Sequence, residues 1–573
     1  MDKSQLTIEQ NAVIKHEGSA FISACPGAGK TRCIIERARK VLSKPNKYRG
    51  LAFLSFTNAA ISELESRLTK DNLLPTPVFP HFVGTFDSFI WHYLVEPFGL
   101  SGCDNSLSVI PDTGSLIIKP FPKAQGLRLD CFDRNTGMII PAEAKKTGFN
   151  RDPTGYETIA RKLRAGLLRN GQLDFDDVRN VARINLDNDR FSKRLGCVLR
   201  TRFGEIIVDE AQDCNPDDLL IINWLRASKI PTKIVCDPHQ SIYGFRGGVS
   251  DELFKYAETF PINERFRLSG NFRSTRHICK TVYMLRSPSQ RGTEDKALGE
   301  LKDCDLNIHI LSYSGRGLSP KIGQAFLTIA SKAGIDLKDC RLTAKTRSSG
   351  LKAIGAYTEN VGQSLSLRLA DAVMKFHYAE RSQDQFFAIT ELHIITIIIS
   401  GKLDGRTYHQ FISEEKLESL AWRGQIVKIL QTLCFDISKG HTRSEWIARS
   451  RRELGAFLPA GAGTIAQKLH NQNQLDDILS QIPTSCLTAR TIHQVKGKQY
   501  QGMCVVLTTA TAKGIIAHLE KEPDNSMAED AREIYVAASR AQRLLVFACP
   551  KSQSARFATH ISSTGAAVQL TEI

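Results

Sequence analysis

The most informative stretch of this chain is Ala24-Cys-Pro-Gly-Ala-Gly-Lys-Thr31. It follows the apolar run Ala20-Phe-Ile-Ser23, which is typical of a buried strand, and precedes Thr31-Arg-Cys-Ile-Ile35, which is typical of a helix start. A glycine-rich turn in this position brings backbone N–H groups and the helix amino terminus close to an anion. We expect Lys30 to reach the β- and γ-phosphates of a nucleotide, and the Thr31 hydroxyl to bind Mg²⁺. The stretch therefore predicts a nucleoside triphosphate site.

A second acidic element lies far downstream, at the end of another apolar run. Ile206-Ile-Val208 is typical of a buried parallel strand, and Asp-Glu-Ala-Gln-Asp213 follows it directly. In open α/β sheets, ligands bind at the carboxyl ends of the strands. We therefore expect Asp209 to bind Mg²⁺ through water and Glu210 to polarise the water that attacks the nucleotide. Together with Lys30, these carboxylates predict nucleotide hydrolysis.

Further strand-then-helix units lie between and after these two elements. The run 51–58 leads into a predicted helix at 59–68, and the run 82–87 leads into another. The run 233–240 has the same apolar-then-polar pattern. Because strands and helices alternate, the sequence predicts an α/β fold with a parallel sheet flanked by helices.

Composition limits the partners and the compartment. At about 150 residues per domain, the 573 residues suggest roughly four compact units, and the net charge of +16 favours a polyanionic partner such as nucleic acid. Fourteen cysteines without a C-x-x-C motif indicate reduced thiols rather than a disulfide framework or zinc ribbon. The first residues have no apolar core, so we expect no signal peptide, and the most apolar segment, 393–400, is shorter than the about 20 residues that span a bilayer. We expect a cytoplasmic protein with no membrane partner.

The motifs, in their order along the chain, resemble those of superfamily 1 DNA helicases of the UvrD/Rep/PcrA type. Besides the two nucleotide motifs, the matching segments are Ser55-Phe-Thr-Asn-Ala-Ala60, Gly84-Thr-Phe86, Leu173-Asp-Phe-Asp-Asp177, Gln240-Ser-Ile-Tyr-Gly-Phe-Arg-Gly247, Asn271-Phe-Arg-Ser-Thr275, Thr491-Ile-His-Gln-Val-Lys-Gly-Lys-Gln-Tyr500 and Tyr535-Val-Ala-Ala-Ser-Arg-Ala541. The motifs extend from residue 6 to residue 541, so the resemblance covers most of the chain. It implies an α/β fold with two RecA-like parallel-sheet motor domains, each interrupted by a mainly helical insertion.

The resemblance also implies domain boundaries. The expected first motor core consists of residues 1–91 and 173–260, with a first insertion at 92–172. The expected second core consists of residues 261–350 and 485–573, with a short helical second insertion at 351–484. Apolar periodicity predicts a basic helix near 156–165 in the first insertion. In the second insertion it predicts helices at 365–380, 384–400, 414–434 and 443–458.

For the nucleotide, the resemblance implies ATP as substrate with Mg²⁺ held by Thr31 and Asp209. The residues expected to act in catalysis are Lys30, Asp209, Glu210, Gln240, Arg273 and Arg540. Those expected to bind the nucleotide are Gln10, Ala24, Cys25, Pro26, Gly27, Ala28, Gly29, Lys30, Thr31, Arg32, Phe272, Gly497 and Gln499. Gln499 stands where the family usually has a glutamate that binds the ribose, which predicts a relaxed preference for sugar or base.

For the nucleic acid, the resemblance implies single-stranded or partly duplex DNA as partner. The expected DNA-binding residues are Phe56, Thr57, Asn58, Thr85, Phe86, Tyr243, Phe245, Arg246 and His493. The aromatic side chains among them are expected to form a stacking track, which tolerates any sequence because every base has a π-face. If two cores clasp the nucleotide, hydrolysis is coupled to their closure and so to movement along the strand. The family tracks 3′ to 5′, and that direction is implied by the resemblance alone.

A more specific resemblance leaves a second function open. The segment 82–89, the following Glu96-Pro-Phe98 and the short second insertion are similar to the helicase-like B subunits of Gabija anti-phage systems. That resemblance implies a partner, an OLD-family nuclease subunit with Toprim and ABC-type ATPase domains. The chain would then sense DNA ends or single strands and activate the nuclease, with little unwinding of its own. Strand displacement by the isolated protein distinguishes this alternative from a helicase.

Overall fold

The computed structural model describes residues 6–43, 49–100, 102–242, 250–315, 317–355, 364–378, 382–403, 406–479, 487, 489–521 and 525–573. The chain forms two compact units. The first comprises Met1–Leu94, Ala182–Tyr357 and Leu487–Ile573, and the second comprises Val95–Val181 and Thr358–Cys486. The first unit contains two large sheets, whereas the second is mainly helical.

The first large sheet of the first unit has six strands in the order β10-β1-β9-β8-β2-β3. All of its neighbouring strands pair in parallel. The strands are β1 (Ala20–Ala24), β2 (Gly50–Ser55), β3 (Phe82–Thr85), β8 (Phe203–Val208), β9 (Thr232–Cys236) and β10 (Arg265–Leu268). Because β10 pairs with β1, this sheet extends past residue 260, the predicted end of the first core.

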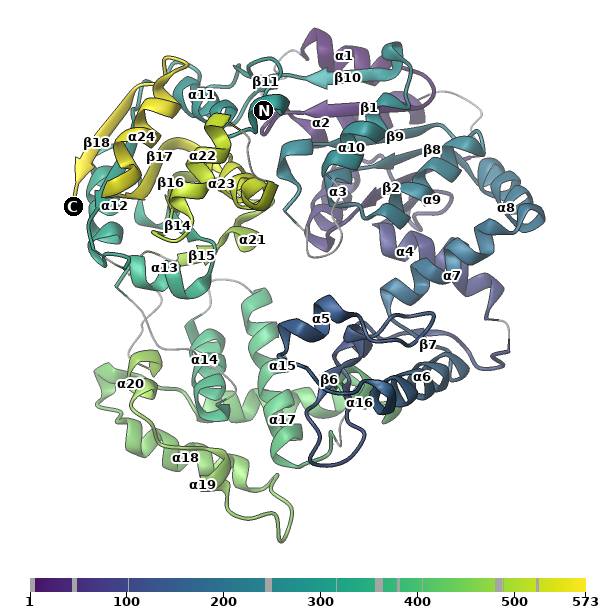
Figure 1. Ribbon diagram of the computed structural model, residues 1–573, viewed down its shortest axis with the longest axis vertical. Helices are drawn as coiled ribbons and strands as arrows, with labels where there is room; N and C mark the ends of the chain where they lie inside the picture. Colours follow the sequence, from purple (N-terminus) through teal and green to yellow (C-terminus); the bar gives the residue numbers. More distant parts are fainter. Residues whose placement is uncertain are drawn as a thin grey trace. The chain divides into compact units, whose positions relative to one another are not determined.

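Helices surround this sheet as the alternating pattern predicts (Figure 1). They are α1 (Ile8–Lys15), α2 (Lys30–Leu42), α3 (Asn58–Lys70), α4 (Phe86–Ile90), α8 (Asp189–Arg202), α9 (Pro216–Ala227) and α10 (Ser250–Glu258). Every residue of β2 is buried, as expected for a parallel strand covered on both faces. A buried ion pair joins α2 to β8, because Arg37 donates to both carboxylate oxygens of Glu205 at 3.0 and 2.6 Å.

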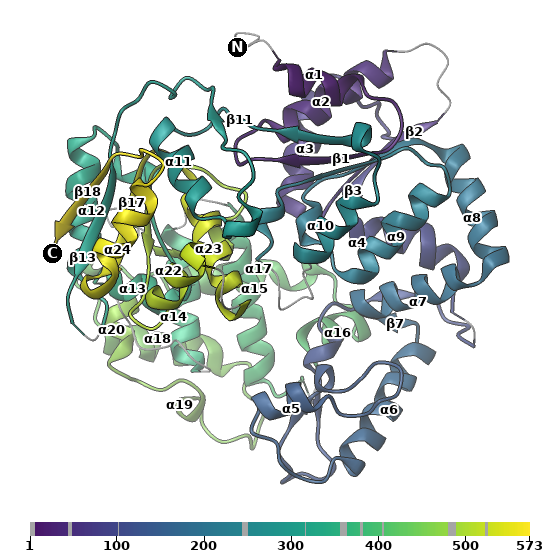
Figure 2. The ribbon, with the colours of Figure 1, turned by 45° about the horizontal axis from the view of Figure 1, so that its top comes forward.

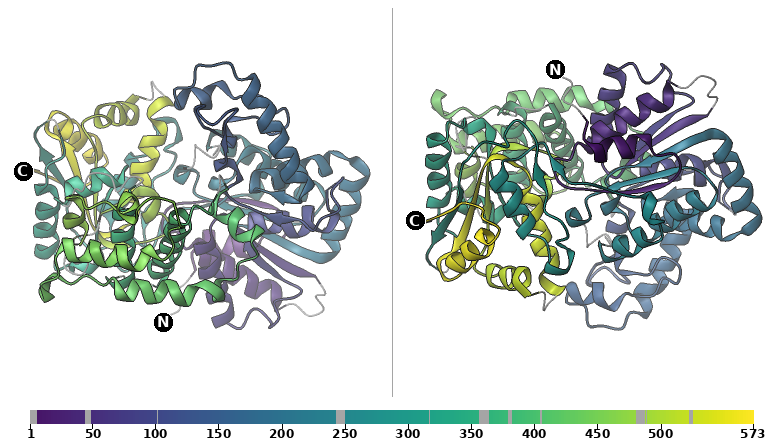
Figure 3. Two further views of the ribbon diagram at one scale, coloured as in Figure 1. Left: turned by 90° about the horizontal axis from the view of Figure 1, so that it is seen from below. Right: turned by 90° about the horizontal axis from the view of Figure 1, so that it is seen from above.

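The second large sheet also has six parallel strands, in the order β15-β14-β16-β17-β13-β18. Figure 2 labels three of them, β13, β17 and β18, and Figure 3 shows the chain from two further sides. They are β13 (Ile308–Tyr313), β14 (Cys340–Ala344), β15 (Ala489–Thr491), β16 (Tyr500–Val506), β17 (Ala541–Pro550) and β18 (Val568–Glu572). The helices beside it are α11 (Arg276–Met284), α12 (Lys321–Lys332), α13 (Arg347–Ala353), α21 (Ile492–Val495), α22 (Ala512–Lys521), α23 (Ala528–Ala538) and α24 (Lys551–Ser562). Short strands β11 (Gly270–Asn271) and β12 (Lys296–Ala297) pair with each other. The predicted α/β fold with two RecA-like parallel sheets is confirmed.

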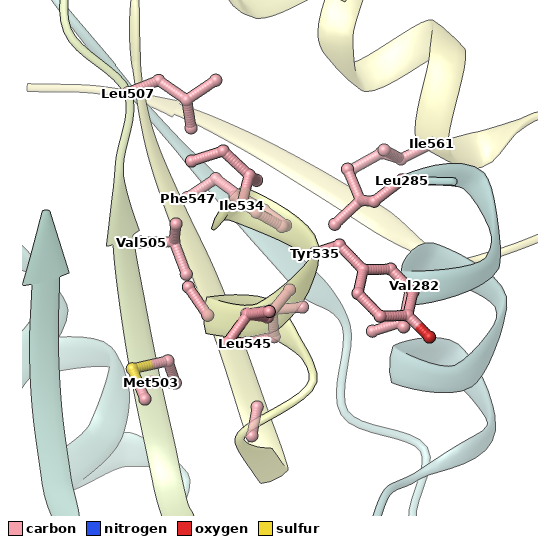
Figure 4. Close-up of a cluster of buried hydrophobic side chains, with 14 of the residues drawn as sticks. Val282, Leu285, Met503, Val505, Leu507, Ile534, Tyr535, Leu545, Phe547 and Ile561 are labelled. Atoms are coloured by element: carbon pink, nitrogen blue, oxygen red, sulfur yellow. The ribbon is translucent and has the colours of Figure 1, made fainter. Parts of the chain in front are cut away.

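A hydrophobic core holds α11, α21, α22, α23 and α24 against this second sheet. Figure 4 shows Val505 and Phe547, from β16 and β17, facing Tyr535 of α23 and Val282 of α11. Tyr535 is 1% exposed, so its hydroxyl must find a partner inside the protein. That partner belongs to the candidate site described below.

The second unit consists mainly of helices. Those of the first insertion are α5 (Pro141–Lys146), α6 (Thr154–Arg169) and the start of α7 (Phe175–Asp187), beside the strand pairs β4 (Ser108–Val109) with β7 (Gln172–Leu173) and β5 (Ile117–Ile118) with β6 (Leu127–Arg128). Those of the second insertion are α14 (Leu365–Tyr378), α15 (Ser382–Ile399), α16 (Tyr408–Glu414), α17 (Ser419–Thr432), α18 (Arg443–Gly455), α19 (Ile465–Lys468) and α20 (Gln474–Leu479). The insertions contact each other, because the Thr407 hydroxyl donates to Asp112 at 2.8 Å.

One predicted helix of the second insertion is wrong in extent. The sequence pattern predicts a single helix at 414–434, but the chain forms α16 and α17 with a break between them. Lys416 in the break has a φ of 50°, which a continuing right-handed helix cannot contain. None of the described helices combines the length and apolar composition that crossing a lipid bilayer would require.

Candidate nucleotide site and nucleic-acid interface

The loop between β1 and α2 has the backbone of a phosphate-binding loop. Gly29 caps α2 in the left-handed region, with φ 76° and ψ 33°. Gly27 also has a positive φ of 74°, and a Cβ added there would lie 2.6 Å from Asn271 Oδ1 and 2.7 Å from Arg273 Cβ. Only glycine fits at this position. The predicted residues Ala24, Cys25, Pro26, Gly27, Ala28, Gly29, Lys30, Thr31 and Arg32 thus form the end of β1, the loop and the first turn of α2.

Lys30 and Glu210 form an ion pair at the carboxyl ends of β1 and β8. Lys30 Nζ lies 3.0 Å from Glu210 Oε1. Burial opposes the charge of Lys30, but the carboxylates of Glu210, Asp209 and Asp237 outweigh it and raise the pKa of the lysine above its ordinary value. Burial likewise opposes the charge of Glu210, yet Lys30 and Lys496 lower the pKa of Glu210 to about 2. Both partners therefore stay charged at neutral pH.

Asp209 occupies a position suited to a divalent cation. It follows β8 directly, and its backbone N–H donates to Leu54 O at 2.8 Å. Burial and the charge of Glu210 raise the pKa of Asp209 to about 7. A cation beside Asp209 would offset both effects, and Thr31 on the first turn of α2 offers a hydroxyl oxygen. A carboxylate and a hydroxyl fit Mg²⁺, which binds few protein oxygens and completes its shell with phosphate oxygens and water.

Gln10, the predicted adenine reader, is fixed against the loop. Its side chain is 2% exposed, and its Nε2 donates to Ala28 O at 3.0 Å. Its Oε1 accepts from the N–H of Thr7 at 3.0 Å in a capping box at the start of α1. An amide has two N–H donors and two lone pairs, so one of each is left for another partner. Phe272, the predicted stacking residue, is half-buried and donates its N–H to Gly27 O at 2.9 Å.

Two arginines near the second sheet bond to groups close to this loop. Arg273 donates from Nη1 to Ser539 O at 3.0 Å and from Nε to Gln499 Oε1 at 3.2 Å. Arg540 donates from Nη2 to Gln240 Oε1 at 2.6 Å. Burial and the like charge of Arg540 lower the pKa of Arg273. Two guanidinium groups in this position favour an anion, and phosphate is the anion that their planar donors match well.

A chain of buried polar groups, which the sequence patterns did not predict, joins these residues. Gln212 donates to Glu210 Oε2, and its own Oε1 accepts the backbone N–H of Asp237 at 3.0 Å. Asp237 also accepts from Gln240 Nε2 at 2.8 Å and from the Tyr535 hydroxyl at 3.2 Å. Gln212 and Tyr535 lie inside motifs named above, and Asp237 lies three residues before Gln240 in the run 233–240. Their positions within these segments were the only sequence signal that could have indicated the hydrogen-bonded chain.

A second missed contact joins the end of α21 to the first sheet. Lys496 Nζ lies 2.5 and 2.8 Å from the two carboxylate oxygens of Asp213 and 3.2 Å from Gln240 O. The two side chains are only 9% and 4% exposed. Burial nevertheless raises the pKa of Asp213 to about 6, against the effect of the lysine. The pair is therefore costly to break.

The remaining predicted residues of this motif lie nearby. Gly497 has a φ of 78° directly after Lys496, and Gln499 precedes β16. Gln499 contacts Arg273, and because the amide is neutral this contact does not offset the positive charge of the arginine. His493 lies on α21, with Nε2 3.6 Å from Glu533 Oε1.

The predicted DNA-binding residues of the first sheet lie at the carboxyl ends of β2 and β3. Thr57 and Thr85 are the N-caps of α3 and α4, and each hydroxyl accepts a backbone N–H from its helix. Phe56 is half-buried and Asn58 is exposed. Phe86 is 0% exposed and its ring stacks on Phe56 at 5.2 Å, so the prediction that it stacks on bases is wrong. It supports the Phe56 ring from inside the core. The predicted residues Tyr243, Phe245 and Arg246 lie outside the described residues.

Comparisons with known proteins agree with this architecture. Residues 6–261 match a model of the UvrD/REP helicase N-terminal domain. The chain is 28% identical over 287 residues to a probable DNA helicase II homolog of Mycoplasma capricolum, covering 47% of this chain and 38% of the relative. It is 19% identical over 613 residues to the ATP-dependent DNA helicase Rep of Buchnera aphidicola, covering 94% of each.

A third relative is the ATP-dependent DNA helicase PcrA of Staphylococcus epidermidis. The chain is 28% identical to it over 289 residues, covering 48% of this chain and 39% of the relative. The alignments with PcrA and with the DNA helicase II homolog thus span less than half of those relatives. The predicted resemblance to UvrD/Rep/PcrA-type helicases is confirmed.

Proposed function

We propose that this chain, which is similar to UvrD-type superfamily 1 helicases, hydrolyses ATP and thereby moves along single-stranded DNA. The observation that carries the proposal is the bond of Arg540, between α23 and β17, to Gln240, in the turn after β9. A catalytic cation from the second sheet is thereby tied to the edge of the first sheet that holds Lys30 and Glu210. Hydrolysis at such a site depends on how the two sheets are placed, which is the requirement for a motor.

The contacts suggest how each residue acts. Amides of the loop and the Lys30 ammonium bind the phosphates, so Lys30 must exchange Glu210 for phosphate when ATP enters. Mg²⁺, held by Thr31 and Asp209, would supply charge neutralisation of the phosphoryl group. Glu210 orients and polarises the attacking water. Because the pKa of Glu210 is low, its carboxylate is too weak a base to retain the proton that the water loses. Arg273 and Arg540 then stabilise the charge that develops on the γ-phosphoryl oxygens.

The side chains after β2 and β3 are proposed to bind the DNA strand. Phe56 offers a partly exposed ring, and Thr57 and Asn58 offer polar groups beside it. These residues lie at the same edge of the sheet as the nucleotide residues, because all of them follow the carboxyl ends of parallel strands. A change at the nucleotide can therefore shift the DNA contacts. We propose the domain division predicted from the sequence for the motor cores and insertions, with β10 added to the first core. The 3′ to 5′ direction is proposed from the family resemblance.

The proposal is tested by ATP hydrolysis of the purified chain with and without single-stranded DNA. The expected result is hydrolysis that the DNA stimulates strongly and that the Lys30→Ala variant loses. Retention of DNA-stimulated hydrolysis by Lys30→Ala would exclude this site as its source. No hydrolysis by the wild-type chain in either condition would overturn the motor assignment.

A second candidate function is that of a DNA-sensing ATPase in anti-phage defence, which activates an OLD-family Toprim nuclease partner. The observation that favours it is exposed apolar surface in the first insertion. Ile117, Phe121 and Met138 are 51%, 55% and 58% exposed, as expected for residues that a protein partner covers. Strand displacement separates the candidates: the motor unwinds a partly duplex DNA by itself, whereas the sensor hydrolyses ATP without displacing the strand.

A further inference from the structure

A charged surface lies at the amino ends of the first sheet, away from the nucleotide. Helix α8 carries four exposed cations, Arg190, Lys193, Arg194 and Arg200. Lys193 and Arg194 lie three and four residues after Arg190, and Arg200 lies seven and six residues after those two. The four cations therefore share one side of the helix over about 15 Å. The opposite side packs inward, because Leu195 and Leu199 are buried. Of these cations only Lys193 has a carboxylate at ion-pair distance within the described chain, the exposed Asp189 at 3.3 Å.

An aromatic ring extends this surface at the end of α8. The Arg202 guanidinium lies 4.3 Å from the centroid of the Phe79 ring and 5.4 Å from that of Phe203. Phe203 is fully buried, but Phe79 is 70% exposed. Arg202 is thus held between a core ring and a surface ring. An exposed ring with a stacked guanidinium is the combination on which unpaired bases stack.

The backbone around Phe79 is held in place. A Cβ on Gly50 would lie 1.9 Å from Pro80 O, so the loop that carries Phe79 lies directly against β2. The Leu51 N–H donates to His81 Nδ1 at 3.0 Å, a second contact that holds the same end of the loop, just before β3. Exposed Arg49 joins the same surface, since its Nη1 donates to Arg200 O at 3.4 Å. The ring and the cations therefore belong to one ordered surface.

This surface is separate from the candidate nucleotide site. α8 leads into the start of β8, Arg49 precedes β2, and Phe79 precedes β3, and these three strands are neighbours in the order β8-β2-β3. The nucleotide and Phe56 groups follow the opposite ends of parallel strands. The two edges are about 20 Å apart, the length of the six-residue strand β2. Figure 1 shows α8 and α9 together on the outside of this sheet.

We propose that Phe79, Arg202 and the exposed cations of α8 form a second binding surface for single-stranded nucleic acid. The cations neutralise phosphates, and the Phe79 ring, backed by Arg202, stacks on one base. A duplex would satisfy the cations but could not offer a free base face to the ring. The inference rests on the proposed function, which supplies a single strand, and adds a second anchoring point for a strand long enough to reach it.

The test measures binding of a long fluorescent oligo-dT at several salt concentrations, with three variants. The first combines Arg190→Gln, Arg194→Gln and Arg200→Gln. The second, Phe79→Ala, removes an exposed ring whose loss leaves the core intact. The control, which makes the same change in net charge on the second sheet's helices and loops, combines Lys321→Gln, Lys332→Gln and Lys338→Gln, all exposed.

Log K falls as log salt rises, and the triple arginine variant is expected to make this fall less steep by about 2, at about 0.7 for each of three lost phosphate contacts. Phe79→Ala is expected to weaken binding about fivefold or more, the lower end for loss of a base stack. The control triple should match the wild type, and all variants should keep wild-type ATP turnover with a short oligo-dT that fills only the first site.

Arginine and Phe79 variants that bind long oligo-dT like the control would overturn this second surface. An arginine variant that loses blunt duplex and oligo-dT equally, with Phe79→Ala unchanged, would overturn its assignment to single strands. If the wild type hydrolyses ATP in response to DNA while these variants behave like the control, only this inference fails. If the wild type neither binds oligo-dT nor responds to it, the proposed function fails as well.

Discussion

The ion pair between Lys496 and Asp213 predicts how strongly the two sheets depend on each other. Replacing Lys496 by glutamine leaves the Asp213 carboxylate, 4% exposed, without its cation. Breaking a buried pair from one side costs about 3–5 kcal/mol. Asp213, whose pKa is already about 6 with the lysine present, would then take up a proton at neutral pH, which holds the cost near the lower end. A loss of about 3 kcal/mol in the transition state corresponds to about 10²-fold in kcat/KM.

A double-mutant cycle assigns this loss to the pair itself. ATP turnover is measured for Lys496→Gln, for Asp213→Asn and for the double variant, with single-stranded DNA saturating. Since the double variant leaves no buried charge, its loss should be smaller than the sum of the single losses by at least about 1.5 kcal/mol. Lys551→Gln, which removes the exposed pair with Glu572, serves as control and should cost less than about 1 kcal/mol. Losses that add within about 0.5 kcal/mol would show that Lys496 and Asp213 do not act as a pair.

Three further predictions concern the first sheet. Lys30→Ala should abolish ATP hydrolysis yet keep oligo-dT affinity within about threefold, because the lysine serves the phosphates; a large loss of affinity in an anisotropy titration would contradict that role. Since Asp209 has a raised pKa of about 7 and must be ionised to bind Mg²⁺, the Mg²⁺ needed for half-maximal turnover should rise about tenfold from about pH 8 to about pH 6, and a flat profile would count against Asp209 as the ligand. Phe86→Ala should lower the free energy of unfolding by about 3–5 kcal/mol in urea, whereas Phe56→Ala should mainly weaken oligo-dT binding; the reverse pattern would place the base contact at Phe86.

Local patterns predicted the elements that hold the candidate site. The strand, loop and helix around Lys30 follow from an apolar run, glycines with positive φ and a helix start, all within a few residues of one another. The strand before Asp209 is equally local, because a buried parallel strand reads as a continuous apolar run. Such signals depend on neighbours in sequence, so one chain suffices to find them.

Contacts between distant residues could not be predicted in the same way. The strand β10 belongs to the first sheet only because it pairs with β1, more than two hundred residues earlier in the chain. Phe86 and Phe56 are both aromatic residues after strands, and only packing shows which ring is buried. Asp237 and Lys496 gain their importance from Tyr535 and Asp213, far away in sequence. The break at Lys416 has no glycine to announce it.

If groups from both sheets complete one nucleotide site, the Arg540→Ala variant must lose turnover while it still binds the nucleotide. Arg540 meets Gln240 across the two sheets, whereas the loop, Lys30 and Glu210 all belong to the first. The measurement pairs the affinity for a fluorescent ATP analogue with ATP turnover in the presence of single-stranded DNA. We expect an affinity within a few-fold of wild type and a turnover lower by about 10³-fold or more, the effect of removing an arginine finger. Turnover close to that of the wild type would show that Arg540 does not complete the nucleotide site.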